Sequence, residues 1–502
     1  MAQPPILNQD SSKLVSLRRV SGAGLANVSY LVIQSLLFVV MTPLVLKALG
    51  PKLYGLWTIL AAITGFASLG NFGIGAGVTK YVSEFSVGEN AGADISGVVS
   101  FSFLFILLTG LLTGMLLFLL RHWIAAKMAR QAGEAMPLAS ALVIIAFGIT
   151  IVFLIQLPKS ILFGLVHHKV VGAIDVAQSV TILGAALIIG LNGGGIVALA
   201  LSLVLINLAF LLILSVVALQ VTRSFVLHFT LNRGLARKML RYSLFAWIAG
   251  LGSMLFSQAD RVLVGIFLGP AAAGAYSICT GVAARLNSLA SSATLVLVPF
   301  ASSYQAQGKN PEVAKAYLHL LRLIGCLLAA IGIVLIFWSN HILSIWISPQ
   351  FAHSYGRVFE ILILAYALFS MIAPGYYISF GLGSPAMPAL VNICGALLML
   401  TLISLLSPPL GLTGAALANI SCSLELALLF VTAKQLSLQK LTSVLRAIVP
   451  PAAILLITIL IVYFYNFPIS INLSINLSLL ILLTWFGLNN GRLAIVLKAI
   501  KK

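Results

Sequence analysis

The chain has 502 residues, of which 61% are hydrophobic and 8% are charged. No soluble fold buries so large an apolar fraction, so the composition excludes a soluble enzyme. The formal net charge is +19, with 29 Lys and Arg residues against 10 Asp and Glu residues. In a membrane protein this excess is expected in cytoplasmic loops, where anionic lipid balances it, and it requires no nucleic-acid partner.

The N-terminal segment 1–21 is polar and carries Lys13, Arg18 and Arg19 ahead of the first apolar run. That run is too long for the core of a signal peptide, so we expect residues 1–21 to be a retained cytoplasmic segment. The apolar runs that follow are each about twenty residues long, which predicts membrane-spanning helices. We expect fourteen spans, at 22–46, 53–73, 98–120, 138–156, 171–191, 195–219, 240–268, 272–298, 320–338, 358–380, 387–406, 412–432, 445–465 and 473–488.

The distribution of Lys and Arg predicts the orientation of the chain. When the N-terminus is placed in the cytoplasm, most of the 29 basic residues fall in cytoplasmic loops and few fall in outer loops. This is the positive-inside bias, and it predicts that both termini face the cytoplasm.

A turn sequence occurs twice in the chain. LGPKLYGLWTI, from Leu49 to Ile59, and LGPAAAGAYSI, from Leu268 to Ile278, share Leu, Gly, Pro, Gly and Ile at the same offsets, with an aromatic residue in the ninth place. Glycine can end a helix and proline cannot continue one, so each copy predicts a break between two helices. A repeat at this separation predicts two similar halves.

Shorter matches extend the repeat. FGL at 163–165 corresponds to FGL at 380–382, and GGIVALAL at 194–201 corresponds to GLTGAALA at 411–418. Six spans in each half preserve direction, so we expect two six-helix lobes related by a pseudo-two-fold axis along the membrane normal, in an all-α integral membrane protein. The predicted parts are the N-lobe 22–219 (helices 1–6), the cytoplasmic linker 220–239, the C-lobe 240–432 (helices 7–12), and 433–502 with helices 13–14 and a basic tail.

Ionisable residues inside predicted spans are candidates for function. They are Asp260 and Arg261 in helix 7, Arg285 in helix 8 and Glu425 in helix 12. The guanidinium fork of Arg binds two phosphate oxygens at once, which favours Arg261 and Arg285 as binding residues for a diphosphate in a wet cavity. A structural ion pair between Asp260 and Arg285 is an equally good interpretation, and both stay open.

The remaining polar candidates carry a weaker signal. Asn27 and Gln34 lie on one face of helix 1, where amides more often join helices than bind a ligand. Lys80 follows helix 2 and is either a contact for a head group at the inner mouth or an interfacial anchor.

GNFGIGAG at 70–77 follows no strand, so it predicts a helix break or close helix packing rather than a nucleotide loop. The four cysteines lack the spacing of a metal site or a disulfide pair and are expected to be small core residues, and no cofactor is expected.

Several of these segments resemble one family. LGPKLYGLW, LGNFGIGAGVTKYVSE, QADRVLVGIFLGPAAAGAYSI and VPFASSYQAQGK, together with the FGL and small-residue blocks, are similar to sequences of the polysaccharide-transporter family. This family of O-antigen and oligosaccharide flippases belongs to the multidrug/oligosaccharidyl-lipid/polysaccharide (MOP) exporter superfamily. The resemblance covers about residues 20–435.

The resemblance implies a flippase, and not an enzyme, in the bacterial inner membrane. Its members move undecaprenyl-diphosphate-linked sugars from the inner to the outer leaflet by alternating access of two lobes. The implied partners are the lipid-linked sugar diphosphate, membrane lipids, and the glycosyltransferases and polymerase of the same pathway.

Three alternatives stay open. A sugar polymerase or ligase would need a substantial catalytic outer loop, whereas the longest predicted outer loops, 121–137 and 339–357, are short. A cation-coupled drug or small-molecule antiporter of the same superfamily usually carries a carboxylate in the first lobe, and helix 1 has none. A lipid II flippase would suit the two extra C-terminal helices.

Overall fold

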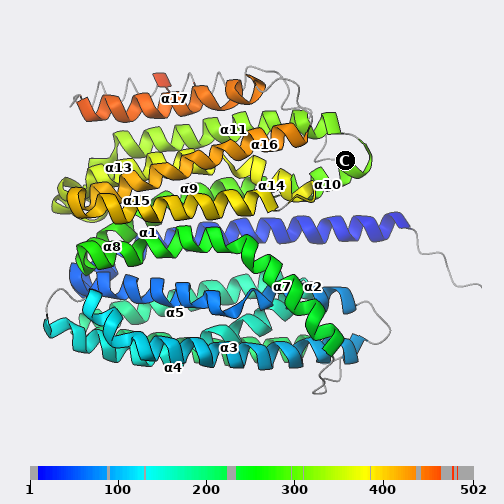
Figure 1. The fold of residues 1–502 in the computed structure, drawn as a ribbon, viewed down its shortest axis with the longest axis horizontal. Helices are drawn as coiled ribbons and strands as arrows, with labels where there is room; N and C mark the ends of the chain where they lie inside the picture. Colours follow the sequence, from blue (N-terminus) through cyan, green and yellow to red (C-terminus); the bar gives the residue numbers. More distant parts are fainter. Residues whose placement is uncertain are drawn as a thin grey trace, which may run out of the picture. The chain divides into compact units, whose positions relative to one another are not determined.

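The computed structural model describes residues 9–86, 91–128, 132–222, 233–295, 297–308, 310–384, 386–436 and 442–464, with isolated helical positions at 478–479 and 483. Within these ranges every regular element is a helix (Figure 1). The prediction of an all-α protein is therefore confirmed. The predicted span 473–488 lies almost entirely outside the described residues, so the count of fourteen spans stays a prediction.

The helices of the first half begin near the N-terminus and end at Val221, at the start of the predicted linker 220–239. They are α1 (Gln9–Ala67), η1 (Ser68–Asn71), α2 (Ile74–Phe85), α3 (Ala91–Met128), α4 (Ala132–Gly164), α5 (His168–Leu191) and α6 (Ile196–Val221).

The second half is divided into more and shorter helices. They are α7 (Arg233–Met254), η2 (Leu255–Ala259), α8 (Asp260–Leu268), α9 (Pro270–Thr294), α10 (Leu297–Ala306), α11 (Asn310–Phe337), α12 (Ser339–Trp346), α13 (Pro349–Ser370), α14 (Ala373–Gly381), α15 (Ala386–Asn419), η3 (Ile420–Leu426), α16 (Ala427–Gln435) and α17 (Thr442–Phe464).

Nine continuous helical stretches among the described residues are long and apolar enough to cross a membrane. Two of them, Val32–Asn71 with 40 residues and Ala386–Gln435 with 50 residues, are too long for one crossing. At 1.5 Å per residue they measure about 60 and 75 Å, against a hydrocarbon core of about 30 Å. Each is interrupted by a glycine with non-helical dihedral angles, Gly50 and Gly411. These glycines divide the stretches where the sequence predicts paired spans.

The predicted spans 240–268 and 272–298 are not among the nine stretches. The first is divided by η2, a π-helical segment that separates α7 from α8. The second corresponds to α9, which is rich in Ala, Ser, Gly and Thr. This part of the chain is helical as expected, but it is less apolar than the other spans.

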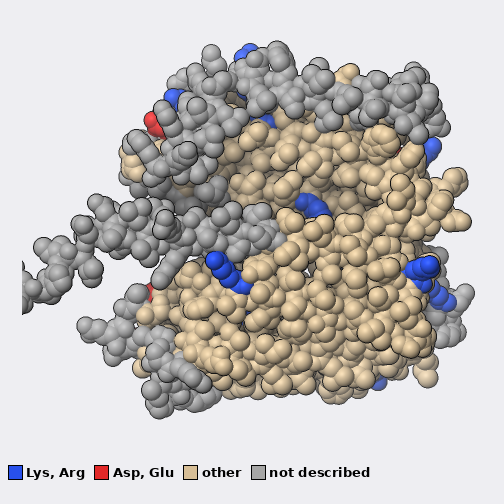
Figure 2. Space-filling model, turned by 180° about the vertical axis from the view of Figure 1, so that it is seen from behind, with Lys and Arg blue, Asp and Glu red and all other residues tan. Residues whose placement is uncertain are grey.

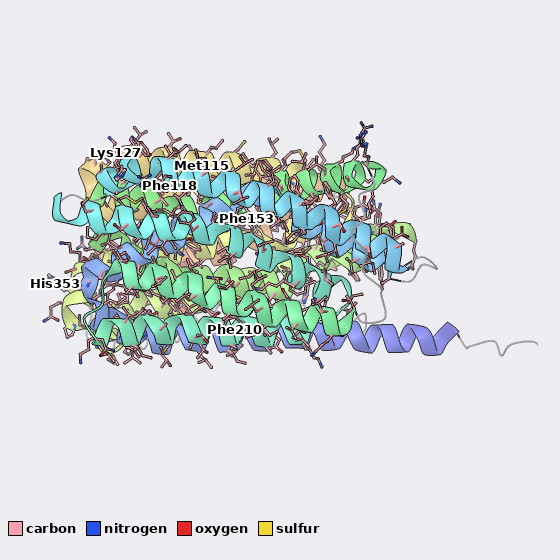
Figure 3. The ribbon with its side chains drawn as sticks, turned by 90° about the horizontal axis from the view of Figure 1, so that it is seen from below. Met115, Phe118, Lys127, Phe153, Phe210 and His353 are labelled. Carbon is pink, nitrogen blue, oxygen red and sulfur yellow. The ribbon has the colours of Figure 1, made fainter. Side chains whose placement is uncertain are left out.

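The apolar character of the surface agrees with a lipid environment. Along α3, Leu108, Leu112, Met115 and Leu119 recur at helical spacing and are each more than half exposed. Of the two residues labelled in Figure 3, Met115 is mostly exposed and Phe153 is fully buried. Most of the face seen in Figure 2 carries neither basic nor acidic side chains. Exposed apolar stripes of this size are expected where helices face lipid.

The chain forms two compact units that exchange short segments. Unit 1 consists of Met1–Gly50 and Ala67–Trp247, and unit 2 consists of Pro51–Phe66 and Ile248–Lys502. The predicted lobes 22–219 and 240–432 are continuous, whereas each compact unit takes one segment from the other half of the chain. The lobe boundaries themselves stay a prediction.

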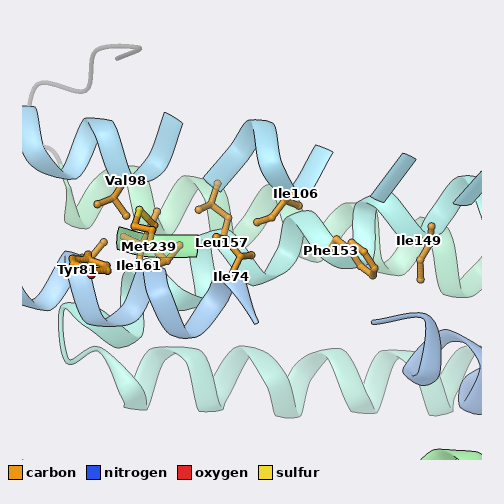
Figure 4. Close-up of a cluster of buried hydrophobic side chains, with 11 residues drawn as sticks. Ile74, Tyr81, Val98, Ile106, Ile149, Phe153, Leu157, Ile161 and Met239 are labelled. Atoms are coloured by element: carbon orange, nitrogen blue, oxygen red, sulfur yellow. The ribbon is translucent and has the colours of Figure 1, made fainter. Parts of the chain in front are cut away.

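The first part of α7 packs into unit 1 through a small buried face. Met239 is fully buried among residues of α2, α3 and α4 (Figure 4). Ser243 lies directly against Gly73 and Gly77, where any added Cβ would come within 2.7 Å and 2.4 Å of Ser243 atoms. The indole of Trp247 donates a hydrogen bond to the carbonyl of Leu69, 2.8 Å away. These contacts explain why α7 as far as Trp247 belongs to unit 1.

The two copies of the repeated turn pack against each other within unit 2. A Cβ at Gly55 would lie 1.8 Å from the carbonyl oxygen of Pro270, and a Cβ at Gly274 would lie 3.0 Å from the Cα of Gly55. Only glycine permits backbones to approach so closely. The last glycine of each turn is therefore a contact residue for the other turn.

The two halves also repeat in detail. Gly50 (φ 73°, ψ 161°) and Gly269 (φ 90°, ψ 172°) share a backbone conformation that is almost restricted to glycine. Gly164 packs against Thr79 and Val82 of α2, and Gly381 packs in the same way against Val298 and Ala301. Both contacts join matching positions of the sequence repeat, so the prediction of two similar halves is confirmed.

The glycine-rich segment 70–77 combines both predicted roles. The 3-10 helix η1 ends at Asn71, and the left-handed Phe72 (φ 49°) and Gly73 (φ 67°) separate it from α2. Close packing then follows at Gly73 and Gly77.

The prediction for the cysteines holds for Cys279, Cys326 and Cys422, which are buried, and is wrong for Cys394, which is exposed on α15.

Candidate functional site

Irregular helical segments place polar residues in the interior of unit 2. The π-helical η2 ends immediately before Asp260, and the 3-10 helix η3 contains Cys422 and Glu425. Both interrupt regular α-helical hydrogen bonding, an arrangement often found at functional sites. Elements α8, α9, α13, α15 and η3 contact one another around these residues.

A buried hydrogen-bonded chain begins at Asp260, whose side chain is 1% exposed. Its Oδ1 atom accepts a hydrogen bond from the backbone N–H of Arg261, 2.7 Å away. The hydroxyl of Tyr276 is also near this carboxylate. Asn419 Nδ2 donates to the Tyr276 hydroxyl at 2.8 Å and to the carbonyl of Ala415 at 2.9 Å. The chain therefore joins α8, α9 and α15.

Unit 2 also contains two partly buried arginines, Arg261 of α8 and Arg285 of α9. The two are close enough for their like charges to interact. The Nε atom of Arg261 is buried and has no hydrogen-bond partner among the described residues. Two guanidinium groups in one partly buried site offer several donors to an anion that has two phosphate groups.

The ion pair between Asp260 and Arg285 is not formed in this structure. Among the described residues, the partners of Asp260 are Arg261 and Tyr276. Tyr276 and Arg285 both belong to α9. They are nine residues apart, which puts them on opposite sides of the helix and about 13 Å apart along its axis. A carboxylate that faces Tyr276 therefore does not face Arg285.

Glu425 belongs to the same polar region of unit 2. Its side chain is 3% exposed and lies flat against α15, because Gly395 has no Cβ to exclude it. Four predicted residues, Asp260, Arg261, Arg285 and Glu425, therefore belong to unit 2, and their roles remain predictions.

The other three predicted residues belong to unit 1. Lys80 is exposed on α2, and its Nζ atom lies 4.8 Å from the ring centroid of Tyr81 and 4.5 Å from that of Tyr242. Gln34 is exposed on α1, and the side chain of Asn27 lies outside the described part of the structure. The cation–π contacts of Lys80 are compatible with an anchor and also with a head-group contact.

Sequence reasoning missed Tyr276 and Asn419. Tyr276 occupies the ninth place of the repeated turn, where only its aromatic character was noted. Asn419 directly follows the small-residue block 411–418. Their hydrogen bond joins residues 143 positions apart in the chain, so no local pattern predicts it.

The sequence matches a described family over more than half its length. Residues 45–355 match the family described as polysaccharide biosynthesis protein. A relative from Bacillus subtilis (strain 168), described as uncharacterized membrane protein EpsK, is 28% identical over 179 residues. That alignment spans 35% of this chain and 35% of EpsK.

Solved structures show the same fold at low sequence identity. The lipid II flippase MurJ, in an inward closed conformation, has a TM-score of 0.69 and 13% identity, and the match covers 93% of this chain and 99% of MurJ. A multidrug resistance MATE family transporter of the MOP superfamily, in an inward-facing conformation, has a TM-score of 0.65 and 12% identity, with 82% and 98% covered. A MOP superfamily transporter from Pyrococcus furiosus has a TM-score of 0.55 and 16% identity, with 84% and 96% covered.

Proposed function

Because this chain belongs to the polysaccharide biosynthesis protein family and has the fold of MOP-superfamily transporters, we propose that it is a flippase for lipid-linked oligosaccharides. Its substrate is a polysaccharide or O-antigen repeat unit on undecaprenyl diphosphate. The protein moves this lipid from the inner to the outer leaflet of a bacterial cytoplasmic membrane by alternating access, with both of its own termini in the cytoplasm. Glycosyltransferases supply the substrate and a polymerase consumes the product.

The observation that carries this proposal is that two arginines, Arg261 and Arg285, are partly buried inside the same largely apolar helical unit. Charged side chains within membrane-spanning segments are costly and usually serve a substrate or an ion. A diphosphate must be removed from water to cross the membrane, and guanidinium groups replace part of its hydration by charge-assisted hydrogen bonds. The transported sugar itself needs no charged partner.

Export in a strain that lacks the chromosomal copy tests the role of the arginines. We expect Arg261→Ala and Arg285→Ala each to reduce export of the lipid-linked sugar by about tenfold or more, because a hydrogen bond to a charged group contributes about 1.5–3 kcal/mol. Arg261→Lys should be partly tolerated, since Lys lacks the bidentate fork. Protein amounts in the membrane are measured in parallel.

Arg357→Ala is the matched control. Arg357 is an exposed arginine of unit 2 whose guanidinium lies 5.0 Å from the ring centroid of Tyr463, and its removal should leave export intact. Full export by both Arg261→Ala and Arg285→Ala would remove the pair from the mechanism.

A lipid II flippase is the second candidate. The match to MurJ covers 93% of this chain, whereas the match to the MATE transporter covers 82%. Rescue of cells depleted of their own lipid II flippase would favour this function, and failure to rescue would favour the oligosaccharide. The cation-coupled antiporter is a third candidate because Asp260 and Glu425 are buried carboxylates. Transport of a small cation-coupled solute by the purified protein would support it.

A further inference from the structure

The first part of α7 carries a concentration of positive charge. Four exposed basic residues, which we call the basic face of α7, lie in this part: Arg233, Arg237, Lys238 and Arg241. The three arginines follow one another at four-residue intervals, so they lie along one side of the helix over about 12 Å. Like charges at this spacing repel each other, and an anion bound between them would relieve the repulsion.

The chain itself supplies little negative charge to this face. The sequence has no acidic residue between Asp175 and Asp260. Among the described residues, the four members of the basic face form no ion pair. The counter-charge is therefore expected to come from another molecule.

Packing against unit 1 fixes the direction of the basic face. Met239 is fully buried against α2, α3 and α4 (Figure 4), and Ser243 is buried against the glycines of α2. At 3.6 residues per turn, these two residues lie on the side of α7 opposite to Arg237 and Arg241. At the edge, the Nζ atom of Lys80 lies 4.5 Å from the ring centroid of Tyr242, which joins α2 to α7. The basic face therefore points away from the core of unit 1.

The exposed side of α7 changes from basic to apolar within one turn. Leu244 and Ile248 continue the side of Arg237 and Arg241, and they are 37% and 46% exposed. Tyr242, at the transition, is 39% exposed. Arginine, then tyrosine, then aliphatic residues is the order expected where a helix passes from lipid head groups into hydrocarbon. The anions at the level of the basic face are then the phosphates of phospholipids.

We propose that the basic face of α7 binds the head groups of anionic phospholipids, on the membrane side predicted to be cytoplasmic. Guanidinium groups bind phosphate oxygens in pairs, and a basic cluster directly before a membrane-spanning helix is attracted to anionic lipid. An acidic soluble protein or a nucleic acid fits this face less well, because its exposed side continues into residues that face lipid. The inference is independent of the transported substrate.

Native mass spectrometry of the purified full-length protein in detergent tests this inference. The protein is titrated with dioleoylphosphatidylglycerol and, separately, with dioleoylphosphatidylcholine, which has the same acyl chains and no net charge. We expect the wild type to bind phosphatidylglycerol more tightly than phosphatidylcholine. One basic residue at an anionic surface contributes about fivefold in affinity. The triple variant Arg237→Gln, Lys238→Gln, Arg241→Gln should therefore raise the dissociation constant for phosphatidylglycerol by more than about tenfold and leave that for phosphatidylcholine unchanged.

A second triple variant is the matched control. Lys47, Lys127 and Lys315 are exposed on α1, α3 and α11, and their replacement by Gln removes the same charge at three separate places. This variant should keep the wild-type preference for phosphatidylglycerol. Equal weakening by both triple variants would mean that net charge alone attracts the lipid, and it would overturn the assignment to α7.

A charge-conserving variant separates charge from folding. Arg237→Lys, Lys238→Arg, Arg241→Lys should bind phosphatidylglycerol within about threefold of the wild type, because the attraction depends mainly on charge. Loss of binding in this variant would show that the substitutions disturb α7 itself and would refute the inference. If the Gln triple variant is not monodisperse, Arg241→Gln alone gives the same test, with an expected weakening of about fivefold.

Two results for the wild type would also overturn the inference. The first is equal affinity for the two lipids. The second is displacement of phosphatidylglycerol by soluble glycerol phosphate at similar concentration, which would indicate a site for a free phosphate compound rather than for lipid. Arg261→Ala should leave phosphatidylglycerol binding intact, so failure of the proposed transport site and failure of this lipid surface are distinguishable.

Discussion

Gly55→Ala tests the contact between the two repeated turns. The added methyl group would lie 1.8 Å from the carbonyl oxygen and 2.4 Å from the carbonyl carbon of Pro270. Both are backbone atoms at the start of α9, so no side-chain rotation relieves the overlap, and the helices must separate by more than about 1 Å to restore normal contact. Overpacking of this kind costs about 1–3 kcal/mol, and a rigid neighbour favours the upper end of that range.

The cost is reduced by the higher helix propensity of alanine, by at most about 1 kcal/mol. We therefore expect Gly55→Ala to be net destabilising by about 1–2 kcal/mol, visible as a fall of about 1–2 °C in the melting midpoint of a chain of this length. Thermal unfolding of the detergent-solubilised protein, followed by fluorescence-detected size-exclusion chromatography, measures this midpoint.

Gly184→Ala is the matched control for Gly55→Ala. Gly184 lies within α5, and a Cβ there would have no atom within 4 Å. Its replacement should leave the melting midpoint unchanged or raise it slightly, because only the helix propensity changes. If Gly55→Ala and Gly184→Ala unfold at the same temperature, the close packing of the two turns does not contribute to stability and the reasoning is refuted.

Three further outcomes follow from the structure. Gly269→Ala should lower the same melting midpoint through backbone strain of about 1–3 kcal/mol, and an unchanged midpoint would contradict the left-handed conformation at φ 90°. Lys80→Gln should cost about 1 kcal/mol of cation–π interaction and leave export intact, whereas loss of export at normal protein levels would assign Lys80 to head-group binding. Collapse of the membrane potential in vesicles should slow flipping even without a pH gradient, because moving two negative charges outward at 100 mV contributes about 4–5 kcal/mol. Transport that ignores the potential and follows a pH or sodium gradient would contradict this last prediction and point to Asp260 or Glu425 as a coupling carboxylate.

The amino-acid sequence was sufficient for features that depend on short stretches of chain. Long apolar runs identify membrane-spanning helices because each helix meets lipid along its own length. The breaks at Gly50 and Gly411 were predictable because the backbone freedom of glycine acts at the residue itself. The sequence repeat was recognisable because equivalent contacts place the same demands on the same positions, as at Gly164 and Gly381 of the FGL blocks.

Only the tertiary structure decided which distant residues meet. Each compact unit contains one segment from the other half of the chain: unit 2 contains Pro51–Phe66, and unit 1 contains α7 as far as Trp247. The reason is that packing depends on which helix faces fit together and how closely the backbones approach, and not on order along the chain. Asp260 illustrates the same limit for the candidate site. The sequence left an ion pair between Asp260 and Arg285 open, yet on α9 Tyr276 and Arg285 lie on opposite sides, and Asp260 is near Tyr276. The pairing of charges depends on the direction of each side chain, and that direction is set by helices distant in sequence.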